Sequence, residues 1–461
     1  MSDVAERPAP VTPRTAADRS DKVVVGRNGV AITHRPKTTG SGYRSYEVYQ
    51  RMRVQQSTER LSPAQLVSDD FARDPYPALT TLREHYPCFR DWIGNSFWIS
   101  RYDDVTSVFV DEANFETRSK LWHYGLEGYG RDLRMLVPVL TSIARRTDAY
   151  ARAEAEALID AFIGRGEADL ALEFAALYPL RLLARVLDLP AEDFDLFAER
   201  YWRMQRGWRW HPEAEADGRS AMDELTAYFE PLVAARLAAP GDDLVSVIAG
   251  LDQPGGPGTA RDIVVTLLES DHETLHGALA NLLFQLVTHP DQLRRVQDEP
   301  RLVKLAYLET LRHSAPVITA HRYARHEVER FGLLLPEGAL VVCAAAAGNR
   351  DPRVFSDPDR FDVERKDLCH REPRGQYRMD GLPSGIAFGL GRPSRYPAVP
   401  QDRPRSTYAL TRDAAVTAVR TLFDRVGNPR LQASAQPHLS SLRVGEMHTC
   451  WGLPVTFDPR A

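Results

Sequence analysis

Cysteine is scarce in this chain of 461 residues, which contains four: Cys88, Cys343, Cys369 and Cys450. The four are widely spaced and include no Cys-x-x-Cys pair. This pattern argues against a disulfide framework. We therefore expect reduced thiols in a cytoplasmic protein.

A long apolar run is missing from the first twenty residues, which are rich in Pro, Ala, Arg and acidic side chains. Such a segment is neither a secretory signal nor a membrane anchor, and its composition is typical of disorder. Further on, Asn28 and Gly29 stand between two β-branched runs, which predicts a hairpin. We expect residues 1–66 to form a partly disordered N-terminal extension that contains this hairpin.

A strong charge of one sign is also missing, because the formal net charge is -5. A balance this small for the length argues against a nucleic-acid partner and against binding to an acidic membrane surface. Hydrophobic residues make up 43% of the chain and charged residues 26%, as in ordinary soluble globular proteins.

A glycine-containing loop at residues 386–397 is the most informative stretch. Gly389 and Gly391 follow an apolar-aromatic run and predict a tight turn that lets the backbone approach a ligand. Prolines and arginines then alternate up to residue 405. Because proline has a fixed φ and no N–H, regular helix is expected to return only at residues 411–423.

Phe388 and Gly391 match the haem loop Phe-x-x-Gly-x-(His or Arg)-x-Cys-x-Gly, so the chain resembles the cytochrome P-450 superfamily, in its soluble bacterial form. The resemblance places Arg395 in the cysteine slot and Pro397 in the following glycine slot. A guanidinium is always charged and has no lone pair to offer iron. We therefore expect a degenerate member with no haem bound through a cysteine thiolate, and no other cofactor.

Other landmarks of the family follow in its order. Glu309 and Arg312 match Glu-x-x-Arg, and residues 358–361 match the segment that adds a second arginine, here Arg360. The resemblance implies that this structural triad holds the haem loop in place. It also implies a mainly α fold with small β-sheets, the triangular helical prism of cytochrome P-450, as a single domain over residues 67–461.

A long central helix is expected over residues 263–289, and residues 270–274 fall where the family has its oxygen-activating turn. Glu273 and Thr274 match the acid–alcohol pair that relays protons. Asp271 replaces a glycine and would crowd bound dioxygen. The candidate catalytic residues are Asp271, His272, Glu273 and Thr274.

Two other chemistries fit the same residues. His272, Glu273 and His276 form His-Glu-x-x-His, which on a helix places two imidazoles on one face for zinc. Haem could instead be held by Tyr396, which adjoins the lost cysteine slot, since tyrosinate is a known haem ligand. In that case the resemblance assigns Arg134 and Arg322 to the haem propionates.

An aromatic and basic stretch at residues 201–210 falls where the family has a mobile lid over its substrate channel. This stretch either stacks a ligand or a protein partner, or is an amphipathic helix whose arginines cover core tryptophans. We expect the ligand cavity to be lined by Trp122, Trp202, Trp208, Val317 and Thr319.

The resemblance leads to several functional hypotheses. The first is a haem-free homologue in bacterial specialised metabolism, of the actinobacterial type. It would act as an auxiliary protein that activates a tailoring enzyme such as a glycosyltransferase, or as a haem-independent catalyst that uses Asp271, His272 and Glu273 on a small molecule in the cavity. The second is an oxidoreductase with haem on Tyr396. The third is a zinc hydrolase that uses His272 and His276.

Overall fold

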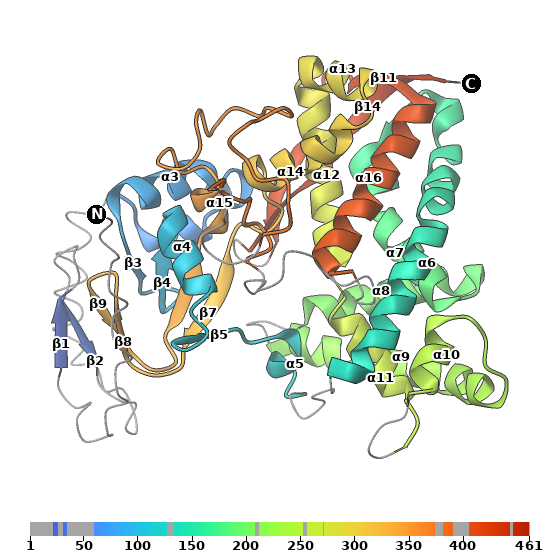
Figure 1. The fold of residues 1–461 in the computed structure, drawn as a ribbon, viewed down its shortest axis with the longest axis horizontal. Coiled ribbons are helices and arrows are strands. Elements are labelled where there is room, and N and C mark those ends of the chain that lie inside the picture. Colours follow the sequence, from blue (N-terminus) through green and yellow to red (C-terminus); the bar gives the residue numbers. More distant parts are fainter. Residues whose placement is uncertain are drawn as a thin grey trace.

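The computed structural model describes residues 60–126, 133–207, 212–251, 256–270, 272–373, 381–390, 405–442 and 446–460, and the strands 22–25 and 31–34. For these two strands, for 133–136 and for 442 it describes the backbone alone. A strand-rich part lies beside a helix-rich part (Figure 1). The expected fold class, mainly α with small β-sheets, is confirmed.

Four long helices form the centre of the helix-rich part: α6 (Leu133–Asp160), α7 (Leu177–Leu187), α12 (His272–Thr288) and α16 (Thr407–Arg425). Nearly every side chain of α12 is buried. A helix that is buried on all sides belongs inside a core, so α12 runs between its neighbours and not over the surface.

A second hydrophobic cluster is built by α8 (Phe194–Arg206), α9 (Pro212–Ala238), α10 (Leu244–Ala249) and α11 (Ala260–Leu268). Tyr201 and Met204 of α8 are fully buried. Arg203 forms ion pairs with Asp217 at 2.8 Å and with Glu224 at 3.1 Å, both on α9. This stretch is therefore an amphipathic helix as far as residue 207, in which Arg200 and Arg203 pair with carboxylates of α9 and do not cover core tryptophans; Trp208 lies outside the described residues.

The largest sheet of the strand-rich part has the order β3 (Phe89–Asp91), β4 (Ser96–Ile99), β10 (Leu340–Cys343), β7 (Ala320–Ala324), β5 (Phe115–Glu116). β10 is antiparallel to β7 and pairs Cys343 with Ala320 and Val341 with Arg322. Because side chains alternate along a strand, Ala320 and Arg322 share one face of this sheet.

The remaining elements complete the two parts. They are η2 (Pro63–Val67), α2 (Asp69–Arg73), α3 (Tyr76–His85), α4 (Tyr102–Phe109), α5 (Lys120–His123), η4 (Ile163–Arg165), β6 (Glu167–Asp169), η5 (Leu170–Ala175), η6 (Ala191–Asp193), α13 (Pro290–Asp298), α14 (Leu302–His313), β8 (Val328–Arg330), β9 (Leu333–Leu335), α15 (Ala345–Gly348), β11 (Val426–Leu431), β12 (His438–Leu442), β13 (Met447–Gly452) and β14 (Pro454–Pro459). The predicted hairpin is present as β1 (Lys22–Val25) paired with β2 (Ala31–His34).

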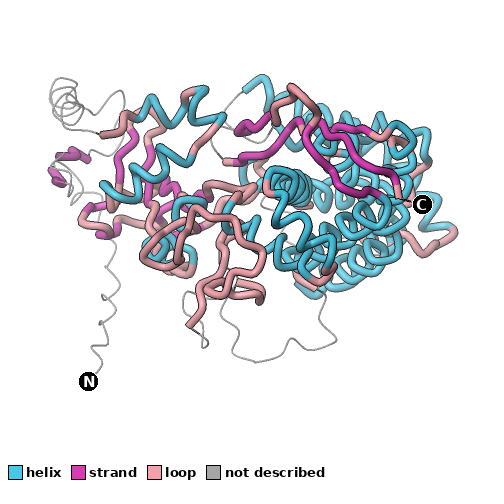
Figure 2. The backbone as a smooth tube through the Cα atoms, turned by 90° about the horizontal axis from the view of Figure 1, so that it is seen from above, coloured by secondary structure: helices cyan, strands magenta, loops and turns pink. Residues whose placement is uncertain are grey.

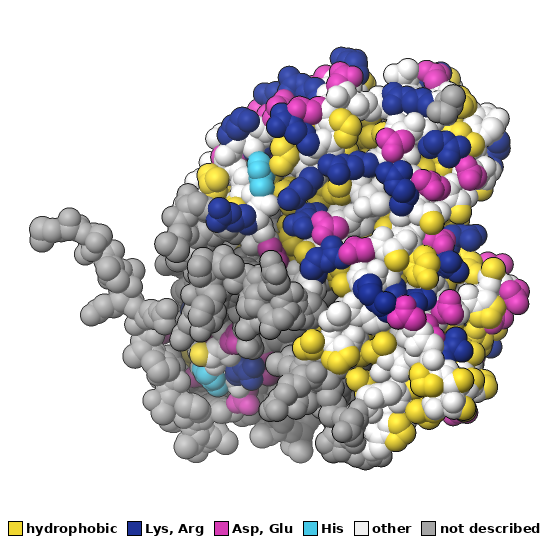
Figure 3. All heavy atoms as spheres, turned by 45° about the vertical axis from the view of Figure 1, so that its right-hand side comes forward, with side chains coloured by type: hydrophobic (Ala, Val, Ile, Leu, Met, Phe, Trp, Pro, Cys, Tyr) yellow, Lys and Arg dark blue, Asp and Glu magenta, His cyan; other side chains and the backbone are white. Residues whose placement is uncertain are grey.

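The strands gather in two places with helices between them (Figure 2). On the face seen in Figure 3, basic and acidic side chains are interspersed over the helix-rich part. None of the helices that the structure describes combines the length and the apolar run needed to cross a membrane.

The central helix differs from its prediction. Residues 263–289 were expected to form one helix, but the structure divides them between α11, which ends at Leu268, and α12, which begins at His272. The side chains around this break are the starting point for the functional site.

Candidate functional site

Ser270 stabilises the break between α11 and α12. Its backbone N–H donates to the carbonyl oxygen of Leu267 at 3.1 Å, and its hydroxyl donates to the same oxygen at 2.7 Å. An i to i-3 bond tightens the last turn, and a serine hydroxyl that takes the carbonyl competes with helix continuation. The apolar periodicity of residues 263–289 does not reveal this competition, and one helix was therefore predicted.

Helix α8 supplies partners for the groups that the break exposes. The buried Gln205 amide donates to the carbonyl oxygens of Leu267 at 3.0 Å and Leu268 at 3.3 Å. These carbonyls lie in the last turn of α11, where intrahelical donors run out. The α8 side chain therefore stabilises the broken form of the central helix.

Tyr201 links the two sides of the break. Its hydroxyl is hydrogen-bonded to Ser270 Oγ and lies 2.6 Å from His272 Nδ1. Ser270 has one hydroxyl proton, which it gives to the Leu267 carbonyl, so Tyr201 donates to Ser270 and accepts from His272. This direction assigns the Nδ1–H tautomer to His272.

Glu273 is buried beside a lysine. Its Oε2 lies 3.6 Å from Nζ of Lys120 on α5, and the same Nζ donates to Gln205 Oε1 at 2.5 Å. Lys120 thus connects Glu273, the acidic residue of the predicted acid–alcohol pair, to Gln205, whose amide binds the last carbonyls of α11. Thr274, its predicted partner, points into a cavity described below, and Asp271 lies outside the described residues.

The two histidines of the His-Glu-x-x-His pattern contact the same tryptophan. The Trp202 ring stands edge-to-face to His272 at 5.0 Å and to His276 at 6.4 Å, between ring centroids. Trp451 of β13 closes the other side of His276 at 5.2 Å. Burial lowers the pKa of His276 to about 4, and the negative charge of Glu273 is a smaller effect that raises this pKa. The imidazole of His276 is therefore neutral at pH 7. Within the described ranges, no three His, Cys, Asp or Glu side chains are placed to share a metal ion.

A cavity of about 530 Å³ lies between α12, β7, the loop at 387–390 and the start of α16; we call it the loop cavity. Its walls include Thr274, Val317, Arg322, Glu372, Phe388, Leu390, Tyr408 and Thr411. It lies where the family resemblance places haem, between the central helix and the loop. Gly389 has φ +75°, and a methyl group added to it would lie 3.9 Å from Arg322 Nη2.

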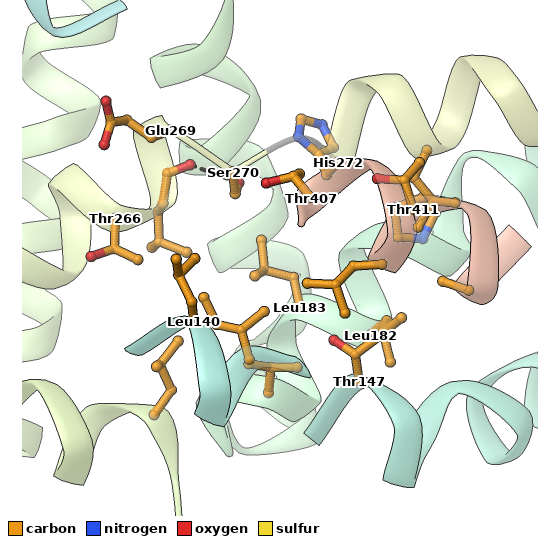
Figure 4. Close-up of a pocket in the computed structure, with 18 of the residues that line it drawn as sticks. Leu140, Thr147, Leu182, Leu183, Thr266, Glu269, Ser270, His272, Thr407 and Thr411 are labelled. Carbon is orange, nitrogen blue, oxygen red and sulfur yellow. Dashed lines mark hydrogen bonds between the residues drawn. The ribbon is translucent and has the colours of Figure 1, made fainter. Parts of the chain in front are cut away.

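A second cavity, of about 410 Å³, opens among α6, α7, α11, α12 and α16; we call it the helix cavity. Figure 4 shows Glu269, Ser270, His272 and Thr407 along one side and the leucines of α6 and α7 opposite. The start of α12 therefore borders both cavities, because His272 lines the helix cavity and Thr274 lines the loop cavity.

The four described residues of the five predicted to line one ligand cavity are not brought together; the fifth, Trp208, lies outside the described residues. Val317 borders the loop cavity, whereas Thr319 is buried and Trp202 packs against the histidines. Trp122 is 36% exposed and packs on Arg118, whose guanidinium carbon lies 4.4 Å from its ring centroid. Trp122 is a surface residue because the four-residue helix α5 leaves its outer side uncovered.

The predicted structural triad has a different third member. Arg312 donates to both carboxylate oxygens of Glu309, at 2.8 and 2.7 Å, and Arg365 donates to Glu309 Oε1 at 3.1 Å. Arg360 was the residue predicted, but its side chain is exposed and its backbone carbonyl accepts from both Arg312 and Arg365. The turn at residues 357–362 presents a carbonyl here, and the buried guanidinium comes from five residues later.

Comparisons with known proteins agree with this geometry. A family model described as Cytochrome P450 matches residues 259–367. Cytochrome P450 107B1 of Saccharopolyspora erythraea is 32% identical over 409 residues, which cover 81% of this chain and 93% of the relative. The chain belongs to the cytochrome P450 family.

Less similar proteins also match over most of the chain. Pulcherriminic acid synthase of Bacillus subtilis (strain 168) is 26% identical over 355 residues, covering 71% of this chain and 84% of the relative. The ligand-free structure of Cytochrome P450 TbtJ1 matches with a TM-score of 0.68 and 24% identity, over 83% of this chain and 97% of that one. The P450 fold expected from the resemblance is therefore confirmed.

Haem is the cofactor that membership of the P450 family implies, and the residues present do not fit its thiolate ligation. All four cysteines are buried free thiols, and none is among the described residues that border the loop cavity. Cys343 shares a sheet with Arg322, but burial raises the pKa of its thiol to about 12, so it is not a thiolate. Arg395 and Tyr396 lie outside the described residues, as does the side chain of Arg134.

Sequence reasoning missed the residues that support the site. Gln205, Lys120 and Tyr201 connect α5 and α8 to the break, and Arg365 completes the ion network. Each makes a contact across a large sequence separation. A second arginine close after residues 358–361 was a visible signal for Arg365, whereas no local pattern distinguishes Gln205 from a surface glutamine.

Proposed function

We propose that this chain is a haem-free P450 family member that acts as an auxiliary protein of a tailoring enzyme, such as a glycosyltransferase, in bacterial specialised metabolism. One combined observation carries the proposal. The ion network of Glu309, Arg312 and Arg365 is present, but no cysteine is among the described residues that border the loop cavity. In the sequence, the family's cysteine slot is held by Arg395. An arginine has no lone pair for iron, so the defining chemistry of the family has no donor at this position.

The arrangement at the helix break also favours a non-oxidative role. Glu273 is engaged by Lys120, and Trp202 packs against both His272 and His276. These side chains stabilise the packing of α5, α8 and α12 on one another. A relay that delivers protons to a reacting centre needs groups that face the cavity, and among the described members of the predicted set only Thr274 borders the loop cavity.

Among relatives, the name pulcherriminic acid synthase denotes a biosynthetic enzyme. A chain that keeps the fold of such enzymes can keep their interaction surfaces after the chemistry is lost. We place the docking function on the body of the protein together with residues 1–59. Arg200 and Arg203 of α8 are excluded from this surface because they are paired with carboxylates of α9, whereas Arg206 at the end of α8 is exposed.

The proposal is tested by measuring the initial rate of a purified glycosyltransferase encoded beside this chain, with increasing amounts of the full-length protein. We expect a rate increase that saturates at a fixed stoichiometry and that heat-unfolded protein does not reproduce. A variant that begins at residue 60 should activate less if the extension contributes. Unchanged glycosyltransferase rates, or conversion of the small molecule by this chain alone, would contradict the auxiliary role.

A further inference from the structure

Three arginine side chains border a third pocket, which we call the arginine pocket. It has a volume of about 360 Å³ and lies where α13 and α14 meet the C-terminal end of α16, beside β11 in Figure 1. Arg152 comes from α6, Arg420 from α16, and Arg460 follows β14. Among the described residues, the arginine pocket shares no bordering residue with the helix cavity or the loop cavity.

Backbone carbonyl groups anchor two of the three guanidinium groups. Nε of Arg420 donates to the carbonyl oxygen of Pro300 at 3.1 Å, and Nη1 of Arg460 donates to that of Phe423 at 2.8 Å. Gly427 leaves room for Arg460, because a methyl group at this position would lie 2.9 Å from Nε. A guanidinium has five N–H donors, so both groups are held at the pocket with most of their donors still available.

The charges at the arginine pocket are only partly balanced. Nη1 of Arg152 lies 3.4 Å from a carboxylate oxygen of Glu156 and 3.7 Å from one of Asp424, so this arginine is paired. Arg420 and Arg460 have no carboxylate within ion-pair distance in the part of the chain that the structure describes. Two positive charges therefore remain at one pocket, and they favour a ligand with two negative charges.

The pocket also has an apolar floor, formed by Val296, Val303 and Phe423. A ligand that fits must therefore join a compact anion to a small organic group. A phosphate monoester does so: it carries nearly two negative charges at pH 7.5 and offers three acceptor oxygens to guanidinium groups. A carboxylate has one charge and two oxygens, which two separate guanidinium groups exceed.

We propose that the arginine pocket binds a small phosphate monoester, whose phosphate group is held by Arg420 and Arg460. This inference does not rest on the proposed function, because the loop cavity borders the other end of α16. A helix rises about 1.5 Å per residue, so Tyr408 at the loop cavity and Phe423 at the arginine pocket are about 22 Å apart along α16. The pocket volume suits a small ligand.

The inference is tested by isothermal titration calorimetry of the full-length protein at pH 7.5 with phenyl phosphate and phenyl sulfate. These probes have the same shape and differ by one negative charge. Phenyl phosphate should bind at a single site and at least about 10-fold more tightly than phenyl sulfate, because the second charge strengthens its hydrogen bonds to the two guanidinium groups. Equal affinities, or no binding of phenyl phosphate at about 10 mM, would overturn the proposal on the unaltered protein.

Charge-removing variants locate the anion. Arg420→Gln and Arg460→Gln should each weaken phenyl phosphate by at least about 5-fold, because each removes a charged donor. Arg73→Gln is the matched control, since Arg73 lies on α2, is 71% exposed and pairs with Asp70, and it should leave the affinity unchanged. An equal loss in Arg73→Gln would indicate a general effect of net charge and would refute the assignment.

A further variant is expected to act in the opposite direction. Asp424→Asn removes the carboxylate that borders the pocket, so it should tighten phenyl phosphate by about 3-fold or more. Local unfolding would weaken binding and cannot produce this gain. Unchanged or weaker binding in Asp424→Asn would contradict an anion held at the arginine pocket.

Discussion

The ion network around Glu309 contains buried guanidinium groups and the loop cavity contains the partly buried guanidinium of Arg322, and the two regions differ in how these groups are satisfied. In the network, Glu309 accepts from Arg312, Arg365 and the backbone N–H of Asp362. In the cavity, Arg322 has one hydrogen bond to the protein and no carboxylate among the described residues. Buried polar groups that serve the fold are paired within the protein. The network is therefore structural, and the cavity is where a ligand or a cofactor belongs.

The largest expected effect tests the structural side of this comparison. Arg365→Gln should lower the free energy of unfolding by about 3 to 5 kcal/mol, because it leaves the buried Glu309 and Arg312 network incomplete. Urea denaturation of the purified protein measures the change. Arg360→Gln is the matched control and should stay within about 0.5 kcal/mol, since the Arg360 side chain is exposed. Equal losses in the two variants would mean that Arg360 belongs to the triad after all.

A smaller effect is expected from the buried imidazole of His276, because it is neutral in the folded state. Its folded pKa of about 4 lies below the unfolded value of 6.5, so its contribution to stability is complete above pH 6.5 and is lost as the pH falls toward 4. Between pH 7 and pH 5 the loss should be about 2 kcal/mol. His276→Gln should remove this share of the pH dependence. If the variant and the original protein lose stability in parallel, His276 is not the titrating group.

The smallest effect concerns the helix break. Tyr201→Phe removes the hydroxyl that joins Ser270 and His272, and it should cost about 1 to 2 kcal/mol because buried polar atoms lose a partner. Tyr150→Phe is the control, since no hydrogen bond of its hydroxyl is found in the described structure, and it should stay within about 0.5 kcal/mol. Thermal unfolding of both variants under one buffer condition provides the comparison. A Tyr201 variant as stable as the control would show that the break does not depend on α8.

The sequence was sufficient for the family fold and for the position of the loop, because both rest on motifs with fixed spacing. Glu309 and Arg312 could be paired from their separation of three residues on one helix. Arg365 could not be chosen over Arg360, because the choice depends on how the turn at residues 357–362 directs its carbonyl groups. Local spacing does not encode that direction.

The candidate site was predictable in part. Val317 was predicted to line the ligand cavity, Thr274 to belong to the acid–alcohol pair, and Arg322 to meet a propionate if haem binds. The structure places all three on the loop cavity. The split of the central helix was not predictable, because Gln205 and Tyr201 reach it from about 65 residues away in the chain. Side-chain capping across such separations leaves the hydrophobic pattern of the helix unchanged.

The visible absorption spectrum of the purified full-length protein, expressed with ample haem precursor, tests the central claim most directly. The account predicts no Soret band, because the cysteine slot carries a guanidinium and the buried thiols of the described residues do not reach the loop cavity. A protein that carries porphyrin in equimolar amount and gives the carbon-monoxide difference band of a thiolate-ligated haem would contradict it.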